Sequence, residues 1–257
     1  MKKGLFLVCM AFAAFTAQAQ ENSGLGGFIK ELYGTLTEIM GTQDEAVPED
    51  GFEVSLGADV VSSYIWRGQN LGGVSIQPSL AIGKNGFSLS AWGSIGLDAN
   101  DAKEFDLTLG YETGGFSVAL TDYWVTGGDE KYFTFAAHRT AHVLEGTLGY
   151  DFGFLALTWN TNIAGADYYG TDGKRAYSSY AEIAVPFTLG GVDFGAELGV
   201  SPWKSEYYGA TGFNLINVGL GATKELNVTP TFSLPLSVKV TCNPKAEQAY
   251  FVFGISF

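Results

Sequence analysis

The sequence has little charge, few cysteine and histidine residues, and no long apolar run beyond its first 20 residues. Only 16% of its 257 residues are charged, compared with about 25% in average soluble proteins. A transmembrane helix needs roughly 18 or more consecutive apolar residues, and no such stretch occurs after residue 20. The composition therefore argues against a helical membrane protein and against a charged helical bundle.

The scarcity of reactive side chains also limits the functions to consider. The chain has 2 His and 2 Cys, and its 14 basic residues are outnumbered by 27 acidic ones, for a formal net charge of −13. A nucleic-acid-binding protein usually carries a basic surface patch, so we expect no nucleic-acid partner. We also expect no metal site, no cofactor and no internal disulfide, because Cys9 lies in the leader described below and leaves Cys242 alone.

Glycine and aromatic residues are abundant instead. The chain contains 35 Gly, and 14% of its residues are aromatic. Aromatic residues are enriched in strands, and a disordered chain would have few of them. The composition therefore favours an all-β protein.

Residues 1–19 have the pattern of a secretory signal peptide. Lys2 and Lys3 precede a short apolar run at 4–15, and Ala17-Gln18-Ala19 forms a small-residue cleavage site. A membrane anchor fits less well, because the run is short and ends at that site. We therefore expect an exported protein that begins at Gln20.

Residues 20–50 are predicted to form an amphipathic helix followed by an acidic linker that contains Pro48. Apolar side chains recur there at spacings of three and four, at Leu25, Phe28, Ile29, Leu32, Leu36, Ile39 and Met40. Three roles remain open for this helix: it plugs the interior of the following domain, lies on a membrane surface, or contacts a periplasmic partner.

From residue 52 onward the apolar residues alternate with polar ones, which is the period of β-strands. The alternation predicts strands at 52–65, 74–83, 87–97, 104–112, 116–125, 141–150, 154–163, 176–187, 192–200, 213–223, 229–240 and 248–257. Short turns at 84–86, 113–115, 151–153, 189–191 and 224–228 alternate with longer connections. This alternation is typical of outer-membrane barrels, so residues 51–257 are predicted to form a 12-stranded antiparallel transmembrane β-barrel. Ten or fourteen strands are the alternatives.

The end of the chain favours a membrane barrel over a soluble β-sandwich. The last strand ends in an aromatic residue, which resembles the C-terminal signal of bacterial outer-membrane proteins. We expect it to be the membrane-insertion signal, recognised by the barrel-assembly machinery, and formed by Tyr250, Phe251, Phe253, Ile255 and Phe257. Aromatic residues near other strand ends are expected to form the girdle that contacts outer-membrane lipid: Tyr64, Trp66, Tyr123, Trp124, Tyr168, Tyr169, Trp203, Tyr207 and Tyr208.

Residues 58–97 also carry a family resemblance. Ser62 to Gly68, Ile76-Gln77-Pro78, Gly86-Phe87 and Ala91 to Ser94, together with Leu148-Gly149-Tyr150 and the last strand, resemble the TorF-like porin family of bacterial outer-membrane proteins. The resemblance implies an outer-membrane barrel with a pore, but it implies no particular solute.

The polar residues of the alternating pattern are expected to face the barrel interior. The charged pore-lining candidates are Glu53, Asp59, Arg67, Asp106, Glu112, Glu145, Glu182, Asp193, Glu197 and Lys239. Their acidic excess would favour cations, unless the charges pair and simply fill the barrel. Arg67, at the mouth of the first strand, would pair with a carboxylate such as Asp59, support the first loop, or select an anionic group.

The sequence therefore predicts a porin that gives small solutes passive passage through a narrow acidic lumen in the bacterial outer membrane. The alternatives are a non-conducting structural or adhesive barrel that acts through its loops and, less compatible with the sequence, a barrel enzyme built around His138 and His142. We expect no enzymatic activity, since the sequence lacks a Gly-x-Ser-x-Gly nucleophile motif. The sequence does not identify the solute or the oligomeric state.

Overall fold

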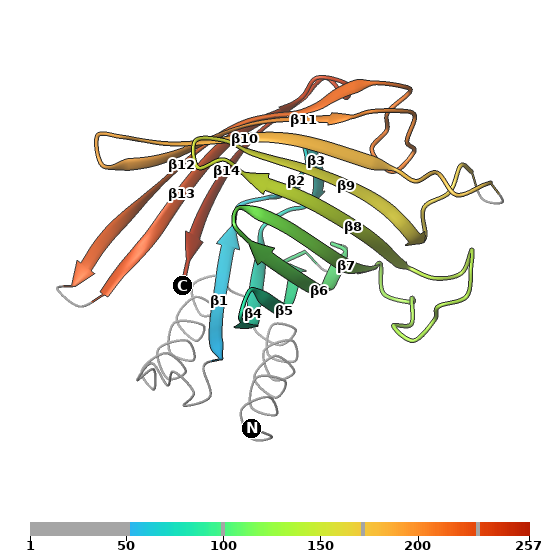
Figure 1. Cartoon of the computed structure of the whole chain (residues 1–257), viewed down its shortest axis with the longest axis horizontal. Coiled ribbons are helices and arrows are strands. Elements are labelled where there is room, and N and C mark those ends of the chain that lie inside the picture. The colour runs from blue at the N-terminus through green and yellow to red at the C-terminus, as the bar shows by residue number, and fades with distance from the viewer. Residues whose placement is uncertain (1–51, 99–100, 171–172, 230–231) are drawn as a thin grey trace. The chain divides into compact units, whose positions relative to one another are not determined.

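The computed structural model describes residues 52–98, 101–170, 173–229 and 232–257, and within them twelve strands close into an antiparallel barrel (Figure 1). This confirms the predicted fold class and strand number. The barrel strands are β1 (Glu53–Val61), β4 (Ser75–Lys84), β5 (Phe87–Gly96), β6 (Lys103–Thr113), β7 (Phe116–Thr126), β8 (His142–Asp151), β9 (Ala156–Gly165), β10 (Ser179–Leu189), β11 (Val192–Ser201), β12 (Asn214–Thr229), β13 (Phe232–Asn243) and β14 (Gln248–Ser256). The predicted signal peptide, helix and acidic linker lie outside the described residues.

The barrel closes where its first strand pairs with its last. β1 pairs with β4 on one side and with β14 on the other, where Asp59, Val60 and Val61 face Ser256, Ile255 and Gly254. Every other barrel strand pairs with the barrel strands next to it in the chain. Closure gives each barrel strand a partner on both sides, as a strand needs in hydrocarbon, where no water satisfies backbone groups.

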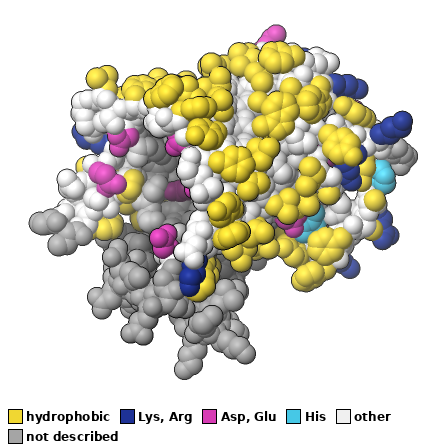
Figure 2. All heavy atoms as spheres, viewed as in Figure 1, with side chains coloured by type: hydrophobic (Ala, Val, Ile, Leu, Met, Phe, Trp, Pro, Cys, Tyr) yellow, Lys and Arg dark blue, Asp and Glu magenta, His cyan; other side chains and the backbone are white. Residues whose placement is uncertain are grey.

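The outer wall is apolar and the inner wall is polar, as the alternating sequence predicted. Leu89, Leu109 and Leu148 are each more than half exposed on the outer wall. Figure 2 shows hydrophobic side chains covering most of the wall that faces the viewer. Such a belt resembles the lipid-facing surface of membrane barrels. No helix in the described part of the chain is long and apolar enough to cross a membrane.

The first strand is shorter than predicted, because a small hairpin follows it. β1 ends at Val61, and the next residues form β2 (Tyr64–Trp66) and β3 (Gln69–Gly72), which pair only with each other. The turn between them consists of Arg67 and Gly68, both with positive φ values of 49° and 75°. The sequence prediction of one strand over 52–65 is therefore wrong beyond Val61.

The predicted turn at 224–228 is also wrong. β12 continues through these residues to Thr229, and Lys224 and Leu226 pair with Leu236 and Leu234 of β13. The alternation of polar residues with Leu226 and Val228 continues the strand through these positions. Cys242 lies in β13 and is a free thiol.

Candidate functional site

The β2–β3 hairpin lies inside the barrel. The carbonyl of Gly68 accepts a hydrogen bond from Nδ2 of Asn243 on β13 at 3.1 Å, whereas Arg67 bonds to Glu145 on β8. β8 and β13 are not neighbours in the sheet. Contacts from both strands to adjacent hairpin residues therefore place the turn of the hairpin within the lumen.

Arg67 is held by a bidentate ion pair. Its Nη1 and Nη2 donate to Oε2 and Oε1 of Glu145 at 2.5 and 2.9 Å, and Nη1 also donates to the Tyr208 hydroxyl at 2.5 Å. The guanidinium lies 4.3 Å from the centre of the Trp66 ring and 4.7 Å from that of Tyr180. Paired nitrogen–oxygen bonds of this kind fix orientation as well as charge, so Arg67 locks the hairpin in one position.

Both partners of the ion pair are almost completely buried. The side chain of Arg67 is 12% exposed and that of Glu145 is 1% exposed. Burial acts to lower the pKa of Arg67, but the neighbouring Tyr208 and the hydrogen-bonded Glu145 outweigh it, so the pKa lies above its ordinary value. Burial raises the pKa of the Tyr208 phenol. The guanidinium therefore stays charged and the phenol stays neutral over the physiological pH range.

The lumen around the hairpin is lined with aromatic rings. The Trp66 ring centre lies 5.7 Å from that of Tyr123 and 6.1 Å from those of Tyr207 and Tyr208, and the Tyr123 hydroxyl donates to Glu145 at 3.0 Å. The prediction that these aromatic residues lie in the membrane girdle is therefore wrong for four that line the lumen: Trp66, Tyr123, Tyr207 and Tyr208. It is also wrong for Tyr64, which packs on the inward-facing ring of Trp92. The reason is the inward fold of the first loop, which the alternating pattern does not encode.

The pore-lining candidates on the barrel strands share the inner face of the barrel, as the strand registers show, whereas Arg67 lies in the turn of the hairpin. Arg67 pairs with Glu145 rather than with Asp59, and Lys239 pairs with Glu197 at 2.6 Å. Tyr180 and Asn217 donate hydrogen bonds to Glu182. Glu53, Asp59, Asp106, Glu112 and Asp193 take part in none of the ion pairs of the described residues. Their role as pore-lining residues stays a prediction.

Sequence reasoning missed two further polar residues in the lumen. Glu104 lies on the same face of β6 as Asp106 and accepts a hydrogen bond from the Tyr64 hydroxyl. Asn162 lies opposite Glu145 in the sheet, is completely buried, and neither of its side-chain polar atoms has a partner. The alternation of residues along β6 and β9 would have identified both.

The two histidines have separate partners. His142 is buried on the outer face of β8, where Nδ1 lies 2.9 Å from both oxygens of Asp122 and Nε2 lies 2.5 Å from the Tyr132 carbonyl. His138 stacks on the Tyr168 ring with centres 4.1 Å apart. No group of three potential metal ligands occurs among the residues that the structure describes.

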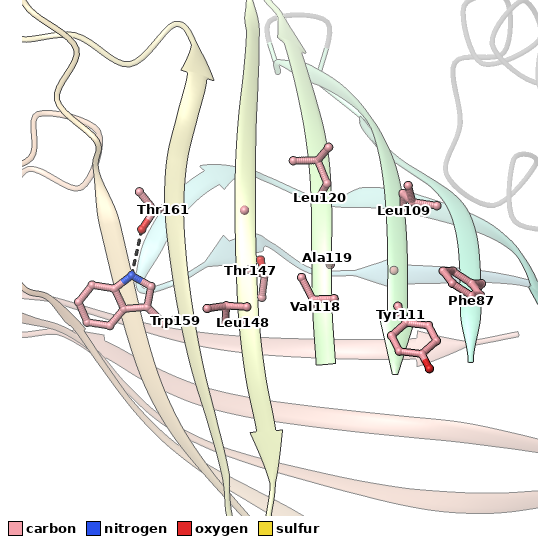
Figure 3. Close-up of a pocket in the computed structure, with 12 residues that line it drawn as sticks. Phe87, Leu109, Tyr111, Val118, Ala119, Leu120, Thr147, Leu148, Trp159 and Thr161 are labelled. Atoms are coloured by element: carbon pink, nitrogen blue, oxygen red, sulfur yellow. Dashed lines mark hydrogen bonds between the residues drawn. The ribbon is translucent and has the colours of Figure 1, made fainter. Parts of the chain in front are cut away.

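A shallow apolar groove crosses the outer wall between β5 and β9 (Figure 3). Gly146 provides no side chain between Leu120 and Leu148, and Trp159 bounds the groove with its indole N–H donating to Thr161 at 3.0 Å. The groove lies on the apolar outer surface, and most of its lining side chains are apolar. It is therefore a feature of the wall and not part of the candidate site.

No curated protein matches the sequence. Among solved structures, a NanC porin is similar at 9% identity, with 79% of this chain and 98% of that chain covered and a TM-score of 0.43. A mutant of the Rh. blastica porin is similar at 14% identity, with 80% and 73% coverage and a TM-score of 0.38. The outer membrane protein opdK from Pseudomonas aeruginosa is similar at 12% identity, with 80% and 66% coverage and a TM-score of 0.37.

These TM-scores are all below 0.5, so the similarities carry no argument about the fold. The barrel is established by the strand pairing of the chain itself. The family comparison is firmer, because one family model matches residues 45–236. That range begins ahead of β1 and ends within β13, and thus includes the hairpin, Arg67 and Glu145. The chain belongs to the family described as bacterial protein of unknown function (Gcw_chp).

Proposed function

We propose that the protein is an outer-membrane porin that gives small solutes passive passage through a narrow, acidic lumen. The observation that carries the proposal is the β2–β3 hairpin inside the barrel, held by the Arg67–Glu145 ion pair. Eight-stranded barrels are filled by side chains, whereas barrels of about 16 to 18 strands contain an open channel. In a 12-stranded barrel, one inward-folded loop is enough to set the width of the passage.

The outer surface and the chain ends support the membrane location. The belt of exposed leucine and phenylalanine side chains suits lipid contact, the first 19 residues have the pattern of an export signal, and residues 58–97 resemble TorF-like porins. The aromatic C-terminal strand, which pairs with β1, is the segment that the barrel-assembly machinery would recognise.

The charges of the inner wall favour cations over anions. The two basic candidates, Arg67 and Lys239, are both engaged in ion pairs, whereas several inward carboxylates have no basic partner among the described residues. Rings of acidic side chains select cations in channels. Passage of small cations and neutral solutes is therefore expected, with larger anions excluded.

Planar-bilayer recording of the full chain tests the proposal. We expect small stepwise currents and, in a KCl gradient, a reversal potential that indicates K⁺ preference. Arg67→Ala should increase the conductance severalfold, because it frees the hairpin from Glu145. Arg175→Ala is the control, because Arg175 is a loop arginine that donates a hydrogen bond to the Gly165 carbonyl. This variant should leave the conductance unchanged. Absence of current from both the wild type and Arg67→Ala would contradict the proposal.

A structural or adhesive barrel is the second candidate, and the paired charges in the lumen favour it. Both basic candidates are neutralised by carboxylates, and the hairpin occupies part of the interior. In that case the long connections β7–β8, β9–β10 and β11–β12 would carry the function. Loss of cell attachment when these loops are shortened, with no current from the wild type, would support this candidate.

A further inference from the structure

Asp106 has an unsatisfied carboxylate oxygen inside the lumen. The residue is 8% exposed, and its Oδ1 has no hydrogen-bond partner, although the carboxylate accepts a hydrogen bond from the Trp124 backbone. Glu104 lies two residues away on the same face of β6. None of the ion pairs in the described ranges involves either carboxylate. Because a buried carboxylate without a counter-ion is unfavourable, a cation beside this oxygen would stabilise the charged form of Asp106.

Aromatic rings surround the same two carboxylates. Trp92 on β5 and Tyr123 on β7 are the direct cross-strand partners of Asp106, and the Cβ atoms of direct partners lie about 4.5–5.5 Å apart. The hairpin adds Tyr64, whose ring centre lies 5.5 Å from that of Trp92 and whose hydroxyl bonds to Glu104. Carboxylates and aromatic rings therefore meet at one place in the lumen.

These groups match the chemistry of an organic ammonium ion. The faces of aromatic rings attract cations, and aromatic cages are a common means of binding alkylated ammonium groups. A divalent calcium ion instead takes six to eight oxygen ligands, and two carboxylates provide too few. We propose that Asp106, Glu104, Trp92, Tyr123 and Tyr64 form a binding site for a small organic ammonium ion. The inference rests on the proposed porin function, since it names a class of solute that the channel takes up.

Tetramethylammonium is a suitable probe for the site. Titrated into the full chain in detergent micelles and followed by calorimetry, it should bind saturably, whereas tert-butyl alcohol, a neutral molecule of similar shape, should not. Asp106→Asn should weaken tetramethylammonium binding at least tenfold, and Trp92→Leu should also weaken it. Asp193→Asn is the matched control, because Asp193 is also an inward carboxylate, on β11, and accepts a hydrogen bond from Thr188. Unlike Asp106, it has no aromatic side chain among the residues it pairs with in the sheet.

The possible results separate the site from the porin function. Equal binding of tert-butyl alcohol, an equal loss in Asp193→Asn, or no saturable binding would each overturn the ammonium site. KCl currents from the same preparations test the porin function independently. Currents without tetramethylammonium binding would remove the site and keep the porin, whereas binding without currents would keep a cation site in a barrel that does not conduct.

Discussion

Arg67 is the residue on which the position of the hairpin depends most. Its guanidinium has a carboxylate, a phenol and two aromatic faces as neighbours, so its charge is compensated although the side chain is buried. Removing one partner of a buried ion pair costs about 3–5 kcal/mol, because it leaves an unpaired buried charge. The pair therefore fixes geometry more than it adds net stability.

Replacing Glu145 by Gln should therefore destabilise the barrel strongly. The expected loss is about 3 kcal/mol or more in the free energy of unfolding, measured by urea denaturation in micelles, and Arg67→Met combined with Glu145→Met should recover part of it. Lys239→Met is the control, because the Lys239–Glu197 pair is 36% and 20% exposed and should contribute only about 1 kcal/mol or less. Equal losses for the two pairs would contradict this account.

His142 anchors the β7–β8 connection to the outer wall. Its ring joins Asp122 of β7 to the Tyr132 carbonyl of the connection and contacts the Phe135 ring at 4.8 Å. His142→Phe removes both polar contacts, so trypsin should cleave at Lys131 and Arg139 several times faster in the folded protein. His138→Phe should not have this effect, because a phenyl ring preserves the stacking on Tyr168. Similar cleavage rates in the two variants would show that His142 is no anchor.

At the scale of elements, the sequence predicts the barrel wall much better than the inside of the barrel. Alternation along a strand follows from the two-residue period of the backbone, so the strands and their outer faces were predictable. The inward fold of the first loop was not, because it depends on contacts between Arg67 and Glu145, 78 positions apart in the chain. The inner-face position of Glu145 was predictable, whereas its partner was not.

The hairpin needs glycine at residue 68. Gly68 has a φ of +75°, and a Cβ atom at this position would lie 2.0 Å from the Ile216 carbonyl oxygen. Gly68→Ala should therefore prevent the hairpin from seating against β12, and the conductance should rise while the barrel still closes. Gly114→Ala is the matched control, since Gly114 also has a positive φ but a Cβ there would contact nothing within 4 Å.

Two measurements decide this prediction. Retention of the heat-modifiable electrophoretic mobility of a folded barrel would show that closure is intact in both variants. Bilayer recording would then show increased conductance for Gly68→Ala alone. An unchanged conductance in a closed Gly68→Ala barrel would mean that the hairpin does not limit the passage.

For the whole molecule, closure depends on a short seam. β1 pairs with β14 through three residue pairs, whereas it pairs with β4 through nine. Further backbone hydrogen bonds lengthen this seam. The Ala58 amide donates to the Phe257 carbonyl at 3.2 Å, and the Phe257 amide donates to the Ala58 carbonyl at 2.9 Å. The Ser62 amide donates to the Phe253 carbonyl at 2.8 Å. The last residue of the chain thus contributes to the barrel through its backbone.

Removing Phe257 should therefore weaken closure more than changing its side chain. Deletion removes both backbone hydrogen bonds with Ala58, each of which contributes about 0.5–1.5 kcal/mol to stability. It also leaves the β1 edge partly unpaired in hydrocarbon, where no water replaces the lost bonds. Phe257→Ala keeps the backbone and loses only outer contacts. Refolding of purified protein into lipid vesicles isolates this effect from the assembly machinery, and the deletion variant should give a lower folded fraction and a lower melting temperature. Equal defects in both variants would assign the effect to the aromatic side chain instead of the seam.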